Sequence, residues 1–112
     1  MSDAKRLTNG QLKAVVYAAT SAIHGTGLFA SRVIEEGEYI GTFVGPEARR
    51  DGVYVLWVYE TADRAVGRSG RNLLRYVNHA TPCNACFDGF ELYALCAIPC
   101  DAEITIDYGG EL

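Results

Sequence analysis

Short apolar runs separated by turn residues make up most of the chain, a pattern typical of strands. It predicts strands at residues 13–20, 28–30, 38–44, 53–59, 90–97 and 103–108. Residues 63–70 are predicted to be loop, and residues 72–77 a short helical turn. Because glycines are many and helical periodicity is almost absent, the pattern predicts a mainly β fold with little helix.

Two segments of the chain share one apolar–turn–strand spacing. The matching residues are Ile34, Gly37 and Ile40 in one segment, and Ile98, Asp101 and Ile104 in the other. Neither segment reaches the length of the usual structural repeats. We therefore interpret them as two similar strand beginnings and not as a true repeat.

Length, composition and charge limit the class of protein. The 112 residues predict one domain, 1–112, with 49% hydrophobic and 21% charged residues as in ordinary globular proteins. No apolar run approaches the length of a membrane span, and the N-terminus lacks the apolar stretch of a secretory signal. We expect a cytoplasmic or nuclear protein without a membrane partner. A net charge of −4 and a pI near 5.0 disfavour direct nucleic-acid binding but suit a basic peptide.

Four cysteines lie in one stretch of the chain: Cys83, Cys86, Cys96 and Cys100. Their spacing resembles that of zinc ligands, since tetrahedral zinc takes four thiolates from two turns. Cys96, however, sits within an apolar run that reads as a strand, and free cysteine is among the most buried residue types. We favour buried free cysteines and predict no metal site.

Three motifs carry the candidate chemistry. They are residues 24–30, which begin with Gly25-x-Gly27; residues 75–79, which end in Asn78-His79 and are followed by Asn84; and residues 103–109. Alone, a Gly-x-Gly is usually a tight turn and an Asn-His pair a hydrogen-bonded turn. In this order and spacing, however, the three resemble the signatures of the SET domain family. The resemblance covers about residues 23–109.

The resemblance implies a SET-domain fold of several short sheets, with a knot-like C-terminal crossing beside Asn78-His79. It implies an S-adenosylmethionine-dependent protein-lysine N-methyltransferase, whose partner is a lysine-containing protein or peptide, with histone tails the commonest family target. The implied cofactor-binding residues are His24, Gly25, Thr26, Gly27, Arg75, Tyr76, Asn78, His79 and Tyr108. The implied catalytic residue is Tyr108, and the implied substrate channel is formed by Phe43, Phe87, Ile106 and Tyr108.

The implied reaction is an in-line attack of a neutral lysine amine on a sulfonium methyl group. A free lysine has a pKa of about 10.4, so its amine must first lose a proton. A narrow, poorly hydrated channel lowers that pKa by desolvation, and the nearby sulfonium charge acts in the same direction. The hydroxyl of Tyr108 would then help to orient the two reactants, which is mainly catalysis by proximity.

The chain departs from the family pattern in ways that bear on activity. Phe43 stands where tyrosine is common, which removes one hydroxyl from the channel, whereas Ala80 for serine and the early Pro82 are expected to be tolerated. No cysteine-rich segment follows, as in the minimal free-standing SET domains of viruses and bacteria. The N-terminal segment, a second subunit or the substrate would then complete the channel, so a homodimer stays open.

Two alternative functions remain open. A non-catalytic SET-like module would bind a peptide or the cofactor without turnover, and Phe43 with the missing C-terminal segment favours it. A small zinc-stapled interaction domain rests on the cysteines alone and ranks last.

Overall fold

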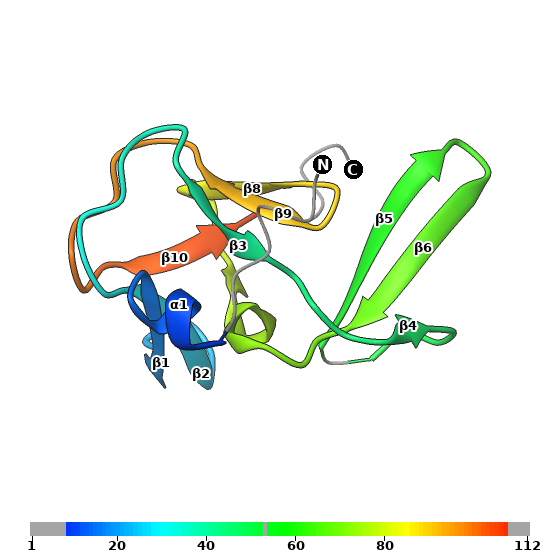
Figure 1. Ribbon diagram of the computed structural model, residues 1–112, viewed down its shortest axis with the longest axis horizontal. Coiled ribbons are helices and arrows are strands. Elements are labelled where there is room, and N and C mark those ends of the chain that lie inside the picture. Colours follow the sequence, from blue (N-terminus) through cyan, green and yellow to red (C-terminus); the bar gives the residue numbers. More distant parts are fainter. Residues whose placement is uncertain (1–8, 53, 108–112) are drawn as a thin grey trace.

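The computed structural model describes residues 9–52 and 54–107. Within them, ten strands form three small sheets, joined by one short α-helix and one 3₁₀-helix (Figure 1). In chain order the elements are α1 (Asn9–Lys13), β1 (Val16–Thr20), β2 (Thr26–Ala30), β3 (Tyr39–Thr42), β4 (Glu47–Ala48), β5 (Val55–Thr61), β6 (Arg64–Ser69), η2 (Leu73–Tyr76), β7 (Asn78–His79), β8 (Ala85–Asp88), β9 (Glu91–Ala94) and β10 (Glu103–Ile106). The expected mainly β fold of several short sheets is confirmed.

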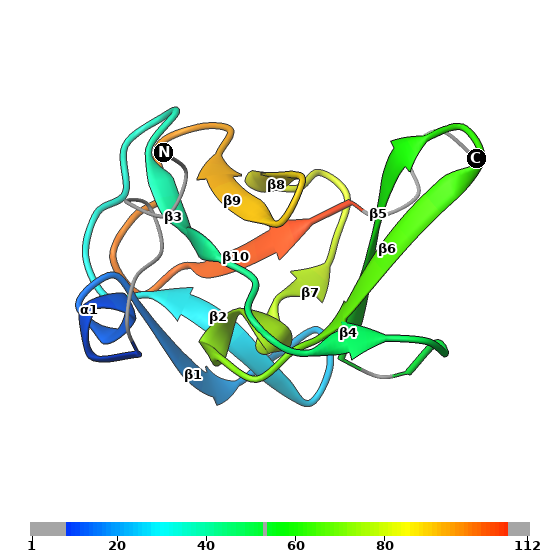
Figure 2. The same ribbon diagram turned by 45° about the vertical axis from the view of Figure 1, so that its right-hand side comes forward.

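The first sheet has the strand order β1-β2-β10-β7. Strands β1 and β2 form a hairpin, β10 pairs antiparallel with β2, and β7 lies parallel to β10 with Thr105 opposite Asn78 and Ile106 opposite His79. Strand β10 thus lies beside the Asn78-His79 segment, although the two are far apart in the sequence (Figure 2). Any further crossing would involve residues beyond 107, outside the described part of the chain.

The second sheet, β3-β9-β8, and the first sheet share one apolar core. Its large side chains that are fully buried include Leu28, Ile34, Ile40, Leu74, Leu92, Ile98 and Ile104. Burying one such side chain contributes roughly 1.5–3 kcal/mol, so this cluster is the main source of stability. No helix in the described ranges has the length and apolar character needed to cross a bilayer.

The third sheet, β4-β6-β5, is dominated by a long hairpin that stands away from the rest of the molecule (Figure 1). At its base the backbone N–H groups of Ser69, Gly70 and Arg71 donate to the carbonyl oxygens of Pro46, Tyr54 and Val44 at 2.9, 2.7 and 2.8 Å, respectively. The bonds to Pro46 and Val44 tie the hairpin to the segment that follows β3, and the bond to Tyr54 closes the base of the hairpin itself.

Two sequence predictions of local structure were wrong, and the short strands β4, β7 and β8 were not predicted. Residues 63–70, expected to be loop, contain β6. The alternation of β6 is interrupted by Gly67, which lies opposite Trp57, and a Cβ there would come within 2.7 Å of the indole ring. The strand expected from residue 13 begins at Val16, because the preceding residues form α1, which buries Leu12 against the core.

The two segments with the same spacing are paired in space. Ile34 and Ile98 form an antiparallel bridge with N–H to carbonyl distances of 2.9 and 2.7 Å. Three residues after each, Gly37 and Asp101 both adopt a left-handed backbone, with φ of 80° and 70°. The spacing therefore marks two similar turns that lead into β3 and β10.

Candidate functional site

A cavity of about 440 Å³ opens between the β1–β2 turn and the segment that connects η2 with β7. The residues that line it are Ile23, His24, Gly25, Thr26, Tyr54, Arg75, Tyr76, Val77, Asn78 and His79. We call it the Gly25 cavity. Two of the three sequence motifs, about fifty residues apart, thus face one another across a single hollow.

The β1–β2 turn is held by a serine at its start. The hydroxyl oxygen of Ser21 accepts hydrogen bonds from the N–H groups of Ile23 at 2.9 Å and His24 at 3.3 Å, and the Ser21 N–H donates to the Gly25 carbonyl at 2.8 Å. Gly25 has φ of +45°, and no atom lies within 4 Å of where its Cβ would be. Glycine therefore serves the backbone conformation here and leaves the turn open to a ligand.

The Asn78 side chain connects the two walls of the cavity. Its Nδ2 donates to the His24 carbonyl at 3.0 Å and to Oε2 of Glu103 at 2.9 Å, with the Thr26 carbonyl further off at 3.5 Å. Because these partners can only accept, they fix the orientation of the amide. Both Nδ2 hydrogens are committed, so Oδ1 is the polar atom that Asn78 can present to a ligand.

Glu103 belongs to the third motif, but sequence reasoning did not assign it to the site. Besides Asn78, its carboxylate accepts from the Ser21 hydroxyl, which lies 2.8 Å from both oxygens. A Cβ on Gly27 would lie 2.4 Å from Oε2 of Glu103. Gly27 does not line the cavity, and its lack of a side chain makes room for the carboxylate and not for a ligand.

Aromatic rings and a guanidinium group form another part of the wall. The Arg75 guanidinium lies 4.4 Å from the Tyr76 ring centroid and donates to the Tyr76 hydroxyl at 2.6 Å. Tyr54, near the start of the hairpin, meets Tyr76 edge to face at 5.7 Å and is 43% exposed. Sequence reasoning missed Tyr54 because it lies in the apolar run that reads as a strand.

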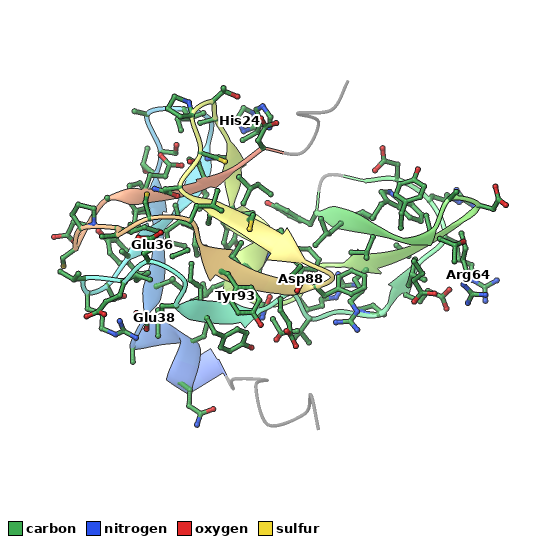
Figure 3. The ribbon with its side chains drawn as sticks, turned by 90° about the horizontal axis from the view of Figure 1, so that it is seen from above. His24, Glu36, Glu38, Arg64, Asp88 and Tyr93 are labelled. Carbon is green, nitrogen blue, oxygen red and sulfur yellow. The ribbon has the colours of Figure 1, made fainter. Side chains whose placement is uncertain are left out.

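A second hollow of about 250 Å³ lies between the hairpin and the body of the molecule. The residues that line it are Leu56, Trp57, Val58, Cys86, Phe87, Gly89, Ile106 and Asp107. We call it the hairpin groove. Its long sides are β5 and β8, each the edge strand of its sheet, and Asp88 lies on the side of the body that faces the hairpin (Figure 3).

The cavity and the groove lie next to one another at the end of β10. His79 lines the Gly25 cavity and Asp107 lines the hairpin groove, and their Nδ1 and Oδ1 atoms are 3.8 Å apart. His24, on the opposite wall of the cavity, lies at the rim of the molecule (Figure 3). Two ligands bound in the two hollows would approach one another at this point.

The residues expected to form the substrate channel are only partly brought together. Phe87 and Ile106 line the hairpin groove, whereas Phe43 is buried and packs edge to face against Phe87 with centroids 6.0 Å apart. Phe43 thus supports the wall from behind. Tyr108, the expected catalytic residue, lies outside the described residues.

The four cysteines are all free. Within the described ranges, no three His, Cys, Asp or Glu side chains are grouped so that they could hold a metal ion. Cys86 lines the hairpin groove, while Cys96 and Cys100 are exposed, against our expectation of buried cysteines. Desolvation, followed by the charge of nearby Asp101, raises the pKa of the Cys100 thiol, which disfavours the thiolate form that binds metals.

Comparisons with known proteins agree with the motifs. Residues 25–109 match the SET domain family. The fold is similar to the methyltransferase domain of human PR domain-containing protein 2, with 26% identity, a TM-score of 0.65, and coverage of 86% of this chain and 78% of that one. It is also similar to the methyltransferase domain of human histone-lysine N-methyltransferase SETMAR, with 17% identity, a TM-score of 0.72, and coverage of 86% of this chain and 45% of that one. No curated protein sequence matches significantly. Three motifs in family order, a shared fold and a family match over most of the chain lead to one conclusion: this chain belongs to the SET domain family.

Proposed function

We propose that the protein is an S-adenosylmethionine-dependent protein-lysine N-methyltransferase. The cofactor would occupy the Gly25 cavity and the lysine-containing segment of a protein substrate would occupy the hairpin groove. The observation that carries the proposal is that the two hollows are neighbours, with His79 of one 3.8 Å from Asp107 of the other. Transfer of a group between two ligands requires such an arrangement, since the reacting atoms must come within about 3–3.5 Å.

The residues of the Gly25 cavity fit S-adenosylmethionine in size and chemistry. About 440 Å³ lies within the range of small-molecule sites, roughly 300–1,000 Å³. The exposed ring of Tyr54 offers an apolar face to a purine, and Oδ1 of Asn78 offers an acceptor to an ammonium group. The open backbone at Gly25 allows close approach. When bound, the cofactor supplies an activated methyl group on a sulfonium.

The hairpin groove suits an extended peptide. Within residues 9–52 and 54–107, strands β5 and β8 each pair on one side only, so a peptide could add to either edge through backbone hydrogen bonds. The groove walls are mainly apolar, with Phe87 and Ile106 placed to contact the methylene stem of a lysine. Desolvation by the apolar walls lowers the pKa of lysine and favours the neutral amine, whereas the Asp107 carboxylate at the end of the groove favours the ammonium.

The first test of this proposal is cofactor binding by the Asn78→Ala variant. This variant loses the hydrogen bonds that Asn78 makes across the cavity walls, and it also loses the acceptor Oδ1. Its affinity for S-adenosylhomocysteine should therefore fall about tenfold or more, on the order of the loss of a buried hydrogen bond. Isothermal titration calorimetry measures this directly. Asn84→Ala is the matched control, because Asn84 bonds the backbone of Glu103 and Thr105 but does not line the cavity.

Methyl transfer itself is tested with labelled S-adenosylmethionine and a panel of histone and ribosomal proteins. Label that becomes acid-stable on lysine supports the enzyme. Cofactor or peptide binding without any incorporation would favour the alternative, a non-catalytic module, for which Phe43 is the supporting observation: its ring carries no hydroxyl and is buried behind Phe87.

The position of the substrate is tested by a charge on the groove wall. Val58→Arg should raise the KM for a lysine peptide about tenfold or more, because a like charge is placed where the substrate cation must pass. The KM for S-adenosylmethionine should stay unchanged. Tyr59→Arg is the control, since Tyr59 is the next residue on β5, is 72% exposed and does not line the groove. An equal effect of both variants would place the peptide elsewhere.

A further inference from the structure

Glu103 carries a negative charge directly behind the wall of the Gly25 cavity. Its carboxylate accepts hydrogen bonds from the Ser21 hydroxyl and from the Asn78 amide, both of which are neutral donors. Among the described residues, no Lys, Arg or His side chain forms an ion pair with Glu103. The charge of Glu103 is therefore not neutralised by an ion pair in this part of the chain. Asn78 is the residue that connects the carboxylate with the cavity.

The space for this carboxylate is built into the turn. A Cβ on Gly27 would lie 2.4 Å from Oε2 of Glu103 and 2.9 Å from Cβ of Ser21, so only glycine admits the carboxylate at this depth. Ser21 is engaged on both sides, because its hydroxyl donates to Glu103 while it accepts from the backbone of the turn. Glu103, Ser21 and Gly27 thus form one packed unit beneath the turn.

A carboxylate hydrogen-bonded to an amide N–H polarises that amide. Hydrogen bonds with an ionised partner are roughly twice as strong as neutral ones, and bonds in a chain strengthen one another. The N–H of Asn78 that faces Glu103 therefore makes Oδ1 of the same amide a better acceptor. A cationic group that binds at Oδ1 is held more tightly because of this charge. The affinity of a neutral group of the same shape changes little.

We propose that Glu103 is a positioning residue that acts through Asn78 and makes this wall of the cavity selective for a ligand with a cationic N–H group, the α-ammonium of the cofactor. The inference rests on the proposed function, because it assumes that the amino-acid end of the cofactor reaches Asn78. Glu103 itself does not line the cavity and has no direct contact with the ligand in this scheme.

The test compares two ligands that differ only at the ammonium group: S-adenosylhomocysteine and its deamino analogue. Glu103→Gln keeps the shape and one acceptor for Asn78 but removes the charge. We expect Glu103→Gln to lower the affinity for S-adenosylhomocysteine about three- to tenfold, which is the scale of losing charge assistance in one hydrogen bond. The affinity for the deamino analogue should change by less than about twofold. Glu103→Asp, which keeps the charge, should restore part of the preference.

Asp101→Asn is the matched control, because it removes a charge two residues away that binds the Tyr17 hydroxyl and does not contact Asn78. An equal loss of affinity for both ligands in Glu103→Gln, or no loss for either, would overturn the inference. A purely structural role of Glu103 would not distinguish between the two ligands. If Glu103→Gln fails to fold, Glu103→Asp keeps the inference testable, because its carboxylate is one methylene further from the Asn78 amide. It should keep only part of the preference for the ammonium, and a preference equal to that of the wild type would overturn the inference. Failure of the wild-type protein to bind S-adenosylhomocysteine at all would instead contradict the proposed function.

Discussion

Replacement of Tyr108 by phenylalanine is expected to lower the rate of methyl transfer by about 10²–10⁴-fold, the usual contribution of a positioned catalytic group. The described part of β10 ends at Ile106 beside His79, and Asp107 lies where the cavity and the groove lie next to one another. The family pattern puts the catalytic hydroxyl on the next residue. Phenylalanine keeps the ring and removes only that hydroxyl, so the fold should be preserved.

Single-turnover assays with labelled S-adenosylmethionine measure this loss separately from binding. The affinity for S-adenosylhomocysteine should change by less than about threefold. A change of that size is smaller than the usual contribution of one hydrogen bond between neutral groups. Tyr59→Phe on the exposed hairpin is the control for loss of a tyrosine hydroxyl. A Tyr108→Phe enzyme as fast as the parent would remove this hydroxyl from the mechanism.

Gly45→Ala is expected to destabilise the protein by more than about 3 kcal/mol, at the upper end of the range for overpacking. A Cβ at this position would lie 1.7 Å from the backbone oxygen of Ser69 and 2.7 Å from its carbonyl carbon. Both obstructing atoms belong to the backbone at the base of the hairpin, so no flexible side chain can move aside. The hairpin and the body would have to separate.

Urea unfolding measures this effect, with Gly52→Ala as the control. A Cβ on Gly52 would meet only the Val55 side chain at 3.4 Å, which is an ordinary contact, so that variant should differ from wild type by less than about 0.5 kcal/mol. Equal stability of the two alanine variants would show that the base of the hairpin is not closely packed.

Local pattern predicted the strands whose own residues form an apolar run, and it missed strands of mixed composition. β5 could be predicted because Val55, Leu56 and Val58 form a run of strand formers. β6 could not, because only Ala65 and Val66 of its six residues are strongly apolar and Gly67 interrupts the run. The reason for Gly67 is its contact with Trp57 on the neighbouring strand, which the composition of β6 alone does not show.

The candidate site divides in the same way. The motifs located His24, Gly25, Asn78 and His79, which the fold brings around one cavity. The interactions of Glu103 depend on a contact with Ser21, 82 residues away in the sequence, and could not be derived from spacing. The hairpin groove is likewise formed by two edge strands from separate sheets. The resemblance located Phe87 and Ile106, whereas Leu56, Trp57 and Val58 on β5 carry no sequence signal beyond being apolar.

The interior position of β10 has a consequence for how the chain is made. Its partners β2 and β7 are synthesised earlier, and Ile104 follows Leu28, its antiparallel partner, by 76 residues. At ribosomal rates of about 5–20 residues per second, this interval lasts roughly 4–15 s. Throughout it, β2 has an unpaired edge and Leu28 lacks a partner from the strand that will cover it. Nascent chains are therefore most exposed to aggregation, and most dependent on chaperones, shortly before residue 106 leaves the ribosome.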